Sequence, residues 1–181
     1  MTAKEILAAS FKEIAEKKNI EKITVKEIAD NCGYSPATFY RNFKDKYDLI
    51  AWSYVQESAR IMGKLNGEYV WRDTLLDGAL YYWENRDYIK NLCVHTSGHD
   101  TFIKYMAQTN ISLLKAEVRK STGDKPIDKQ TELIITTYCL GTVALVCEWV
   151  TGNIEATPQF IAQVFEDSLP VALKQCLYKM R

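Results

Sequence analysis

Side chains that form hydrogen bonds and ion pairs gather in one short segment, residues 24–46. The segment holds three hydroxyls, a phenol and four cations: Thr24, Ser35, Thr38, Tyr40, Lys26, Arg41, Lys44 and Lys46. Hydroxyl and cationic groups of this kind bind phosphate oxygens, and the arginine fork pairs with the edge of a guanine. The residue types therefore predict recognition of a nucleic acid rather than the making or breaking of bonds.

The spacing of capping residues predicts two short helices that position these side chains. Thr24 and Glu27 form a T-x-x-E capping box, which begins a helix with one apolar face. Gly33 supplies the left-handed residue that ends this helix, because glycine adopts that conformation without steric cost. Ser35 then caps a second helix, whose first residue, Pro36, needs no N–H there. The pattern is that of a helix-turn-helix, which lays its second helix in the DNA major groove.

The second helix is expected to turn one face outward and one face inward. The outward face carries Ser35, Ala37, Thr38 and Arg41. Phe39 and Phe43 are four residues apart and should point together into the core. Arg41 suits a guanine edge, and the alternatives for it are a phosphate contact or a solvated surface position.

The segment resembles the DNA-binding domain of the TetR family of bacterial transcription regulators. The residues that match the family pattern in register are Thr24, Ile28, Ala29, Gly33, Ser35, Thr38, Tyr40, Phe43, Lys46 and Leu49. Three residues depart from it: Cys32 replaces the usual alanine, Tyr34 the usual valine and Ala37 the usual glycine. The methyl group of Ala37 lies where the helix approaches DNA, so it bears on operator preference.

The resemblance implies an all-α chain with two parts, a helix-turn-helix DNA-binding domain at residues 1–48 and a helical ligand-binding and dimerisation domain at residues 49–181. It also implies phosphate contacts by Tyr40 and Lys46, and Thr24 and Lys26 are expected to make such contacts at the start of the preceding helix. For Lys26 an ordinary exposed lysine is a comparable alternative. The full set of expected DNA-binding residues is Thr24, Lys26, Ser35, Pro36, Ala37, Thr38, Tyr40, Arg41, Lys44 and Lys46.

Helical periodicity continues through the rest of the chain, for about nine helices in all. The first covers Ile6 to Ala15, with Asn19 as a left-handed stop. Asp87 is expected to cap the sixth helix, and Pro170 predicts a kink or a restart capped by Ser168. The spans expected beyond the helix-turn-helix are 45–64, 71–84, 87–94, 100–120, 128–151 and 157 onward.

The eighth and ninth helices carry the faces expected to form a homodimer. A single helix-turn-helix binds DNA weakly, so a two-fold dimer on a palindromic site is the physical expectation. The eighth helix offers a stripe of mostly small residues and the ninth a long apolar face: Thr137, Gly141, Ala144, Glu148, Phe160, Val164, Phe165, Leu169 and Leu173. The alternative is that these faces serve only the core of the monomer.

Aromatic residues are dense in the second part of the chain, which suits a small-ligand cavity with aromatic walls. The pocket residues expected on this basis are Tyr81, Tyr82, Tyr88, His95, Phe102, Tyr105, Tyr138 and Trp149. Aromatics at helical spacing also form ordinary cores, so this alternative stays open. His95 and His99 have the spacing of two metal ligands, but Ser97 and Gly98 between them indicate a helix end, and no metal or cofactor is expected.

Composition points to a cytoplasmic protein without a membrane segment. Basic and acidic residues balance at 23 each, so a DNA-facing patch must be local. Five cysteines without C-x-x-C spacing favour reduced thiols over disulfides or zinc. The N-terminal residues do not resemble a signal peptide, and the longest uncharged apolar run, Leu133 to Cys147, is shorter than the about 20 residues of a membrane span.

The predicted function is a dimeric, ligand-responsive transcription repressor that is not an enzyme, since no catalytic motif is present. The first alternative is an activator controlled by a protein partner. The order Trp71, Tyr81-Tyr82, Tyr88-Ile89 faintly resembles the family members similar to the dihydroxyacetone kinase operon activator. Rivals of another class are a helical enzyme or an interaction adaptor whose DNA-binding part is vestigial.

Overall fold

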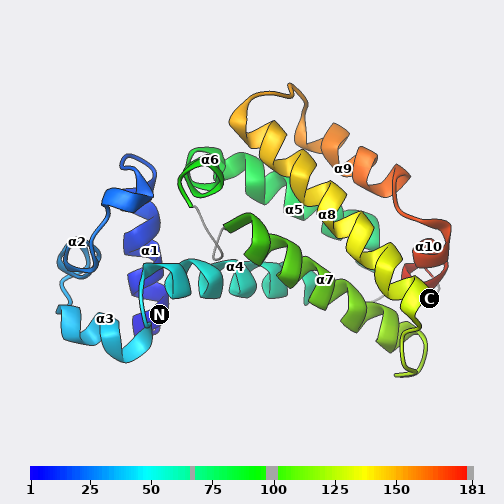
Figure 1. Ribbon diagram of the computed structural model, residues 1–181, viewed down its shortest axis with the longest axis horizontal. Coiled ribbons are helices and arrows are strands. Elements are labelled where there is room, and N and C mark those ends of the chain that lie inside the picture. The colour runs from blue at the N-terminus through cyan, green and yellow to red at the C-terminus, as the bar shows by residue number, and fades with distance from the viewer. Residues whose placement is uncertain (66–67, 97–101, 179–181) are drawn as a thin grey trace.

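The computed structural model describes residues 1–65, 68–96 and 102–178. Within these residues all regular structure is helical, which confirms the predicted all-α class. The head consists of α1 (Ala3–Ala15), the 3-10 helix η1 (Ile20–Lys22), α2 (Val25–Asn31) and α3 (Pro36–Asn42). The body consists of α4 (Lys46–Met62), α5 (Trp71–Glu84), α6 (Arg86–His95), α7 (Phe102–Ser121), α8 (Lys129–Thr151), α9 (Pro158–Asp167) and α10 (Val171–Leu177). Figure 1 shows the head at one end and the body at the other.

The head is a small helical cluster around a mostly apolar centre. Leu7 and Phe11 of α1 pack with Ile28 of α2 and Phe39 of α3, and all four are buried. The hydroxyl of Ser10 donates to the Ile28 carbonyl at 2.7 Å, which fixes α1 against α2. This arrangement leaves the opposite side of α3 facing solvent.

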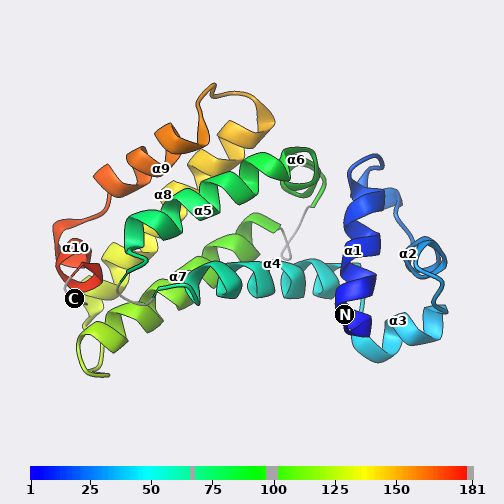
Figure 2. The same cartoon turned by 180° about the vertical axis from the view of Figure 1, so that it is seen from behind.

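Helix α4 joins the two parts, beginning beside α1 and running along the body next to α7 (Figures 1 and 2). Its start is capped by Asp45, whose carboxylate accepts from the backbone N–H groups of Tyr47 at 2.8 Å and Asp48 at 2.9 Å, as predicted. In the body, α5 packs on α9 and α7 packs on α8. The resulting layers enclose the body core between α4 on one side and α8 with α9 on the other (Figure 2).

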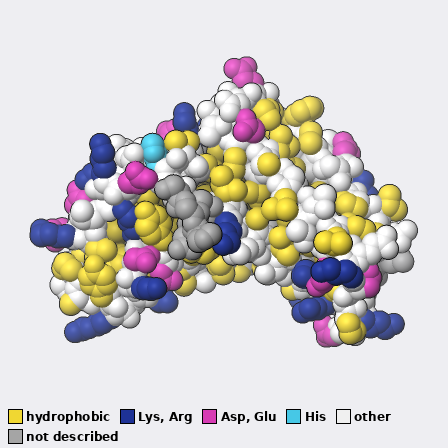
Figure 3. All heavy atoms as spheres, in the orientation of Figure 1, with side chains coloured by type: hydrophobic (Ala, Val, Ile, Leu, Met, Phe, Trp, Pro, Cys, Tyr) yellow, Lys and Arg dark blue, Asp and Glu magenta, His cyan; other side chains and the backbone are white. Residues whose placement is uncertain are grey.

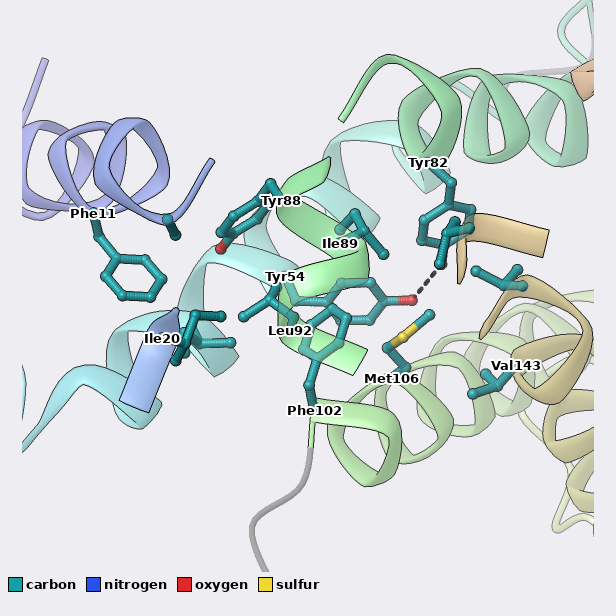
Figure 4. Packing of buried hydrophobic residues seen from close by; sticks show 14 of the residues in the cluster. Phe11, Ile20, Tyr54, Tyr82, Tyr88, Ile89, Leu92, Phe102, Met106 and Val143 are labelled. Carbon is teal, nitrogen blue, oxygen red and sulfur yellow. Dashed lines mark hydrogen bonds between the residues drawn. The ribbon is translucent and has the colours of Figure 1, made fainter. Parts of the chain in front are cut away.

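Helix α6 provides a second contact between head and body. The Asn91 side chain donates to the carbonyls of Ala15 at 2.6 Å and Lys18 at 2.8 Å, which lie at the end of α1. Phe11 and Tyr88 pack edge to face with ring centroids 6.2 Å apart. Figure 4 shows that the buried cluster continues from Phe11, past Tyr88, to the side chains between α4 and α7. Head and body therefore share one core.

One predicted helix stop and two predicted helix caps were wrong. Asn19 has φ −53°, and its side chain caps η1 through the Glu21 N–H, so it is not a left-handed stop. Helix α6 starts at Arg86, which places Asp87 in its first turn instead of at the cap. The restart at Pro170 is present, but Ser168 ends α9 by donating to the Val164 carbonyl at 2.7 Å and does not cap α10.

Helix α8 has the length and apolar composition of a membrane span, as do many core helices of soluble proteins. In the structure it packs against α5, α6 and α7. Leu133 and Leu140 remain 54% and 53% exposed on its free side. Helix α8 is therefore apolar on two sides: one side faces the core, and the other is not covered by the rest of the chain.

Candidate functional site

Helix α3 is held with its polar side outward by its N-terminal cap, the turn before it and two inward rings. The Ser35 hydroxyl accepts from the Thr38 N–H at 3.3 Å, and Gly33 adopts φ +73° in the turn, both as predicted. Phe39 and Phe43 are buried, with centroids 5.8 Å apart. The rigid inward side leaves the outward side free to meet another molecule.

The predicted outward residues are accessible. Ser35, Pro36, Ala37 and Arg41 are exposed, and Thr38 is half-buried beside the Ser35 cap. Tyr40 is 61% exposed, and its ring rests edge-on against Phe39. The hydroxyl of Tyr40 is thereby carried on a supported ring at the rim of α3. Lys44, just beyond α3, is exposed as well.

The start of α2 is stabilised by an ordered polar group. The Thr24 hydroxyl accepts from the Glu27 N–H at 3.2 Å, and the Glu27 carboxylate accepts from the Thr24 N–H at 2.9 Å, which confirms the predicted capping box. Lys18 also pairs with Glu27. The hydrogen bond from Lys18, followed by those from Thr24, lowers the pKa of Glu27 to about 2. Lys26 is exposed and pairs with Asp30 at 2.6 Å.

Lys46, which is predicted to contact a phosphate, is engaged with the chain's own backbone in the structure. Its ammonium donates to the carbonyls of Ile20 at 2.7 Å, Glu21 at 3.0 Å and Ile23 at 2.9 Å. These bonds use all three of its donors, and burial lowers its pKa. Lys46 thus tethers the start of α4 to η1, an interaction that sequence spacing did not reveal because the carbonyls belong to an unpredicted 3-10 turn.

An apolar face covers α8 and α9 on the side shown in Figure 3. The four residues predicted on α8 for a dimer, Thr137, Gly141, Ala144 and Glu148, are all exposed. On α9, Phe160 is 62% exposed and Val164 is half-buried. An open groove of about 1040 Å³ runs between the two helices and is lined by Leu133, Ile134, Thr137, Gly141, Leu145 and Val164, among others.

Three residues predicted at the dimer interface are buried within the chain, although one of them, Phe165, also lines the groove between α8 and α9. Phe165, Leu169 and Leu173 are buried, with Leu173 fully inaccessible. The break at Pro170 was predicted, but the direction that α10 takes after it was not, and in the structure α10 packs on α7 with Leu173 turned inward. Leu133 and Leu140 were missed, although they lie on the free side of α8.

A cavity of about 130 Å³ lies in the body between α4, α5, α7, α8 and α9. Of the eight predicted pocket residues, Tyr82 and Tyr138 line it. The remaining six serve other contacts or lie outside its wall: Tyr81, Tyr88, His95, Phe102, Tyr105 and Trp149. Tyr88 meets the head, Phe102 packs on Tyr54, and Trp149 donates to the Ala156 carbonyl at 2.9 Å.

Polar residues on several helices line the cavity, and five of them are described by their hydrogen bonding. The Tyr54 hydroxyl donates to the Asn110 side-chain oxygen at 2.9 Å, and the Tyr82 hydroxyl lies 2.8 Å from that of Tyr54 (Figure 4). Because Tyr54 gives its proton to Asn110, Tyr82 must donate to Tyr54. Trp71 and Thr74 also line the cavity, and their Nε1 and Oγ1 atoms are fully buried without a hydrogen-bond partner. The predicted pocket did not include the lining residues Tyr54, Trp71, Thr74 and Asn110, because the sequence does not show which helices meet around the cavity.

The predicted histidine pair is described only in part. The ring nitrogen Nδ1 of His95 lies 3.1 Å from the Asn19 amide nitrogen, which places His95 at the junction of head and body. His99 lies outside the described residues. Among the residues that the structure describes, no group of His, Cys, Asp or Glu has the arrangement of a metal site.

Comparison with known proteins agrees with this architecture. Residues 6–51 match the family model of bacterial regulatory proteins of the tetR family, and residues 70–170 match that of a transcriptional regulator C-terminal region. A curated relative, the HTH-type dhaKLM operon transcriptional activator DhaS of Lactococcus lactis subsp. lactis (strain IL1403), is 24% identical over 97 residues. That match covers 54% of this chain and 52% of the relative, so the chain spans about half the length of the relative it matches.

Solved structures share the fold along the whole chain. The dihydroxyacetone kinase operon activator DhaS superposes with a TM-score of 0.71 at 17% identity, covering 97% of this chain and 98% of the other. A transcriptional regulator from Rhodococcus sp. Rha1 gives a TM-score of 0.60 at 14% identity, with 98% and 97% covered. The helix-turn-helix, the helical body and both family matches lead to one assignment: the chain belongs to the tetR family of bacterial transcription regulators.

Proposed function

We propose that the protein is a non-enzymatic, cytoplasmic regulator that binds a palindromic DNA operator as a homodimer, with α3 of each copy in the major groove. The observation that carries the proposal is the outward presentation of α3, with Arg41 exposed while Phe39 and Phe43 anchor the other side. Arg41 is the base-reading side chain, and Tyr40, Lys26 and Lys44 contact phosphates. Lys46 contributes by stabilising the head through its hydrogen bonds to three backbone carbonyls.

The two parts of the chain have separate roles in this proposal. Residues 1–48 bind DNA, and residues 49–181 bind the effector and the second copy. The boundary falls at the start of α4, which contacts α1 at one end and α7 along the other. A rigid helix shared by both parts transmits a change in the body to the head.

Dimerisation through α8 and α9 is supported by the uncovered apolar face on these helices. Exposed leucines and phenylalanine on one face of a soluble protein mark an interaction surface when they are contiguous. A second copy related by a two-fold axis would cover Leu140, Phe160 and the groove around Gly141 in one step. The interface then consists of Thr137, Gly141, Ala144, Glu148, Phe160 and Val164 together with Leu133 and Leu140.

Regulation by an effector is supported by the cavity in the body and by the continuous core that joins it to the head. Tyr54 belongs to α4 and contacts both Tyr82 on the cavity wall and Phe102. A ligand that favours one arrangement of these side chains shifts the population of head spacings in the dimer. The free dimer is the DNA-binding form, which makes the protein a repressor.

A second candidate is an activator controlled by a protein partner. The relatives named as dihydroxyacetone kinase operon activators favour it, since one of them aligns over nearly the full chain. The two candidates share DNA binding and differ in the effector and in the sign of regulation. Transcription from the operator promoter in vitro, with and without the protein, separates them, since a repressor lowers the transcript and an activator raises it.

The test of the shared proposal is fluorescence anisotropy with a labelled duplex from the region upstream of the protein's own gene, against a shuffled duplex of the same composition. Sequence-specific binding is typically about 10³-fold or more tighter than non-specific binding at the same salt. Equal affinity for both duplexes at several salt concentrations would refute a sequence-reading role. The helical enzyme and the adaptor predict that equality.

A further inference from the structure

Two cysteine side chains from different helices meet in the body. Cys93, in the last turn of α6, lies with its Sγ atom 3.5 Å from the Sγ atom of Cys147 on α8. Both residues are half-buried, so part of each remains accessible to a small solute. Cys32, by contrast, donates to two backbone carbonyls of α2, and Cys139 is only 3% exposed. Cys93 and Cys147 are thus placed where a bond between their sulfurs can form within one chain.

The hydrogen bond between the two thiols gives them different chemical roles. The bond from Cys93 lowers the pKa of Cys147, whereas that same bond and burial raise the pKa of Cys93. The thiolate is the nucleophile in thiol oxidation, so Cys147 reacts first. Cys93 then lies beside it as the thiol that closes a disulfide, which is the arrangement of redox-sensing cysteine pairs.

We propose that Cys93 and Cys147 form a reversible oxidation site whose oxidant is a hydroperoxide. The Cys147 thiolate attacks one peroxide oxygen, and the O–O bond breaks. The products are the Cys147 sulfenic acid and one molecule of water or alcohol, whose oxygen takes up the proton that Cys147 had lost. The Cys93 sulfur then attacks the Cys147 sulfur, the S–O bond breaks, and the hydroxyl leaves as water with the Cys93 proton. The two sulfurs lose two electrons in all, and the peroxide gains them.

Helix α6 lies between α8 and the head, so a bond at its last turn acts on the contact between head and body (Figure 1). On the α8 side, Arg86 donates to the carbonyls of Val150 at 3.1 Å and Trp149 at 3.3 Å, which fixes the first turn of α6. On the head side, Asn91 donates to two carbonyls at the end of α1, at 2.6 and 2.8 Å. A movement of the last turn of α6 therefore changes the contact that joins head and body.

Disulfide formation moves that turn. Asn91 and Cys93 are two residues apart on α6, so their side chains point to roughly opposite sides of the helix. Bonded sulfurs are about 2.0 Å apart, closer than the 3.5 Å between the two thiols. Closing the bond draws Cys93 toward α8 and pulls Asn91 away from the carbonyls of the head. The resulting effect on DNA binding rests on the proposed function, whereas the disulfide chemistry does not.

The first experiment measures the disulfide itself in the purified full-length protein without DNA. The reduced wild type is treated with an excess of hydrogen peroxide, its remaining thiols are blocked with iodoacetamide, and its peptides are analysed by mass spectrometry. We expect an intrachain cross-link between the peptides that contain Cys93 and Cys147, and dithiothreitol should reverse it. A sulfinic acid at Cys147 without the cross-link, a disulfide between two chains, or no oxidation of either residue would overturn the proposal.

Single variants test the role of each sulfur. Cys93→Ser keeps a hydrogen-bond donor beside Cys147, so oxidation should stop at the sulfenic acid, which dimedone traps. Cys147→Ser should leave Cys93 much less reactive toward dimedone after the same treatment. Equal labelling of the two variants would contradict the assigned order of reaction.

Cys176→Ser is the matched control, because Cys176 is also half-buried but lies on α10, apart from the pair. It should form the cross-link as the wild type does, and loss of the cross-link in this variant would overturn the pairing. Melting temperatures show whether each variant is folded. The cross-link in the wild type tests the proposal without any variant.

The second experiment compares operator binding by the reduced and the oxidised wild type, using fluorescence anisotropy. We expect oxidation to weaken specific binding about fivefold or more, the usual size of coupling between sites, and dithiothreitol to restore it. Cys147→Ser should bind equally well before and after peroxide treatment. Unchanged affinity of the fully cross-linked protein would overturn the coupling to DNA. Absence of specific binding by the reduced wild type would instead contradict the proposed function and leave the mass-spectrometric result standing.

Discussion

Arg41 is the residue on which sequence discrimination depends in this account. It is exposed on the outward side of α3, and the described residues offer its side chain no ion pair or hydrogen bond. Arg41→Ala should therefore weaken binding of the duplex that carries the preferred base at one position, by about 1–3 kcal/mol in binding free energy. Duplexes with other bases at that position should then bind about as well. The measurement is anisotropy on a set of duplexes with single substitutions. A uniform loss across all duplexes would instead assign Arg41 to a phosphate.

Lys44→Gln provides the matched comparison, since Lys44 is exposed near α3 and is proposed to meet phosphate. Its removal should weaken all duplexes alike. It should also reduce the slope of log K against log salt by about 0.9 for each phosphate that the variant no longer neutralises. An unchanged slope would remove Lys44 from the interface.

Lys46 is a structural residue in this account, and its replacement should destabilise the head. Lys46→Met leaves three carbonyls around η1 without their donor, which costs about 1–3 kcal/mol in the free energy of unfolding. Urea denaturation of the full chain measures this loss. Lys44→Met, at an exposed position, is the control and should change stability little. Equal stability of both variants would restore Lys46 as a candidate DNA contact.

At the scale of single elements, α2 gives a pH-dependent prediction. The pKa of Glu27 is lowered to about 2 from 4.5, first by Lys18 and then by Thr24. A carboxylate with a lowered pKa in the folded state stabilises the protein above pH 4.5, and this contribution disappears as the pH falls toward 2. The melting temperatures of wild type and Glu27→Gln should therefore differ at neutral pH and converge between pH 4.5 and 2. A constant difference over that range would contradict the assignment, and Lys18→Met should move the convergence to higher pH.

The elements differ in how much of them the sequence predicts. Caps are local, so Thr24, Ser35 and Asp45 located the starts of three helices correctly. Ser168 ends α9 and does not begin α10. This outcome depends on the direction of α10 after Pro170, which is set by packing against α7. η1 was missed because three residues leave no periodicity to detect.

At the scale of the whole molecule, the uncovered face of α8 predicts a dimer. A large side chain at Gly141 on this face should disrupt that dimer. A Cβ on Gly141 meets nothing within 4 Å, so Gly141→Arg should be tolerated by the isolated chain. In a two-fold dimer the same side chain meets the partner across the groove. Sedimentation should give a dimer for wild type and a monomer of normal melting behaviour for Gly141→Arg. A monomeric wild type at micromolar concentration would contradict the interface.

The candidate sites show why whole-molecule features escape sequence reasoning. The outward side of α3 follows from a local motif, so the predicted exposure of Ser35, Ala37 and Arg41 is confirmed. The cavity is assembled from five helices, and residue types alone could not say that Tyr88 serves the head while Tyr82 faces the cavity. The direction of α10 after the predicted break at Pro170 likewise depends on packing, and it places Leu173 in the core of the chain.

The central claim is that two copies of α3 read adjacent turns of one DNA duplex. Selection from a random DNA library with the purified protein, followed by hydroxyl-radical footprinting of the selected site, tests it most directly. The account predicts an inverted repeat whose two halves are protected about 34–36 Å apart or a multiple of that spacing. Failure to enrich any sequence, or protection of one isolated half-site by the wild-type protein, would contradict it.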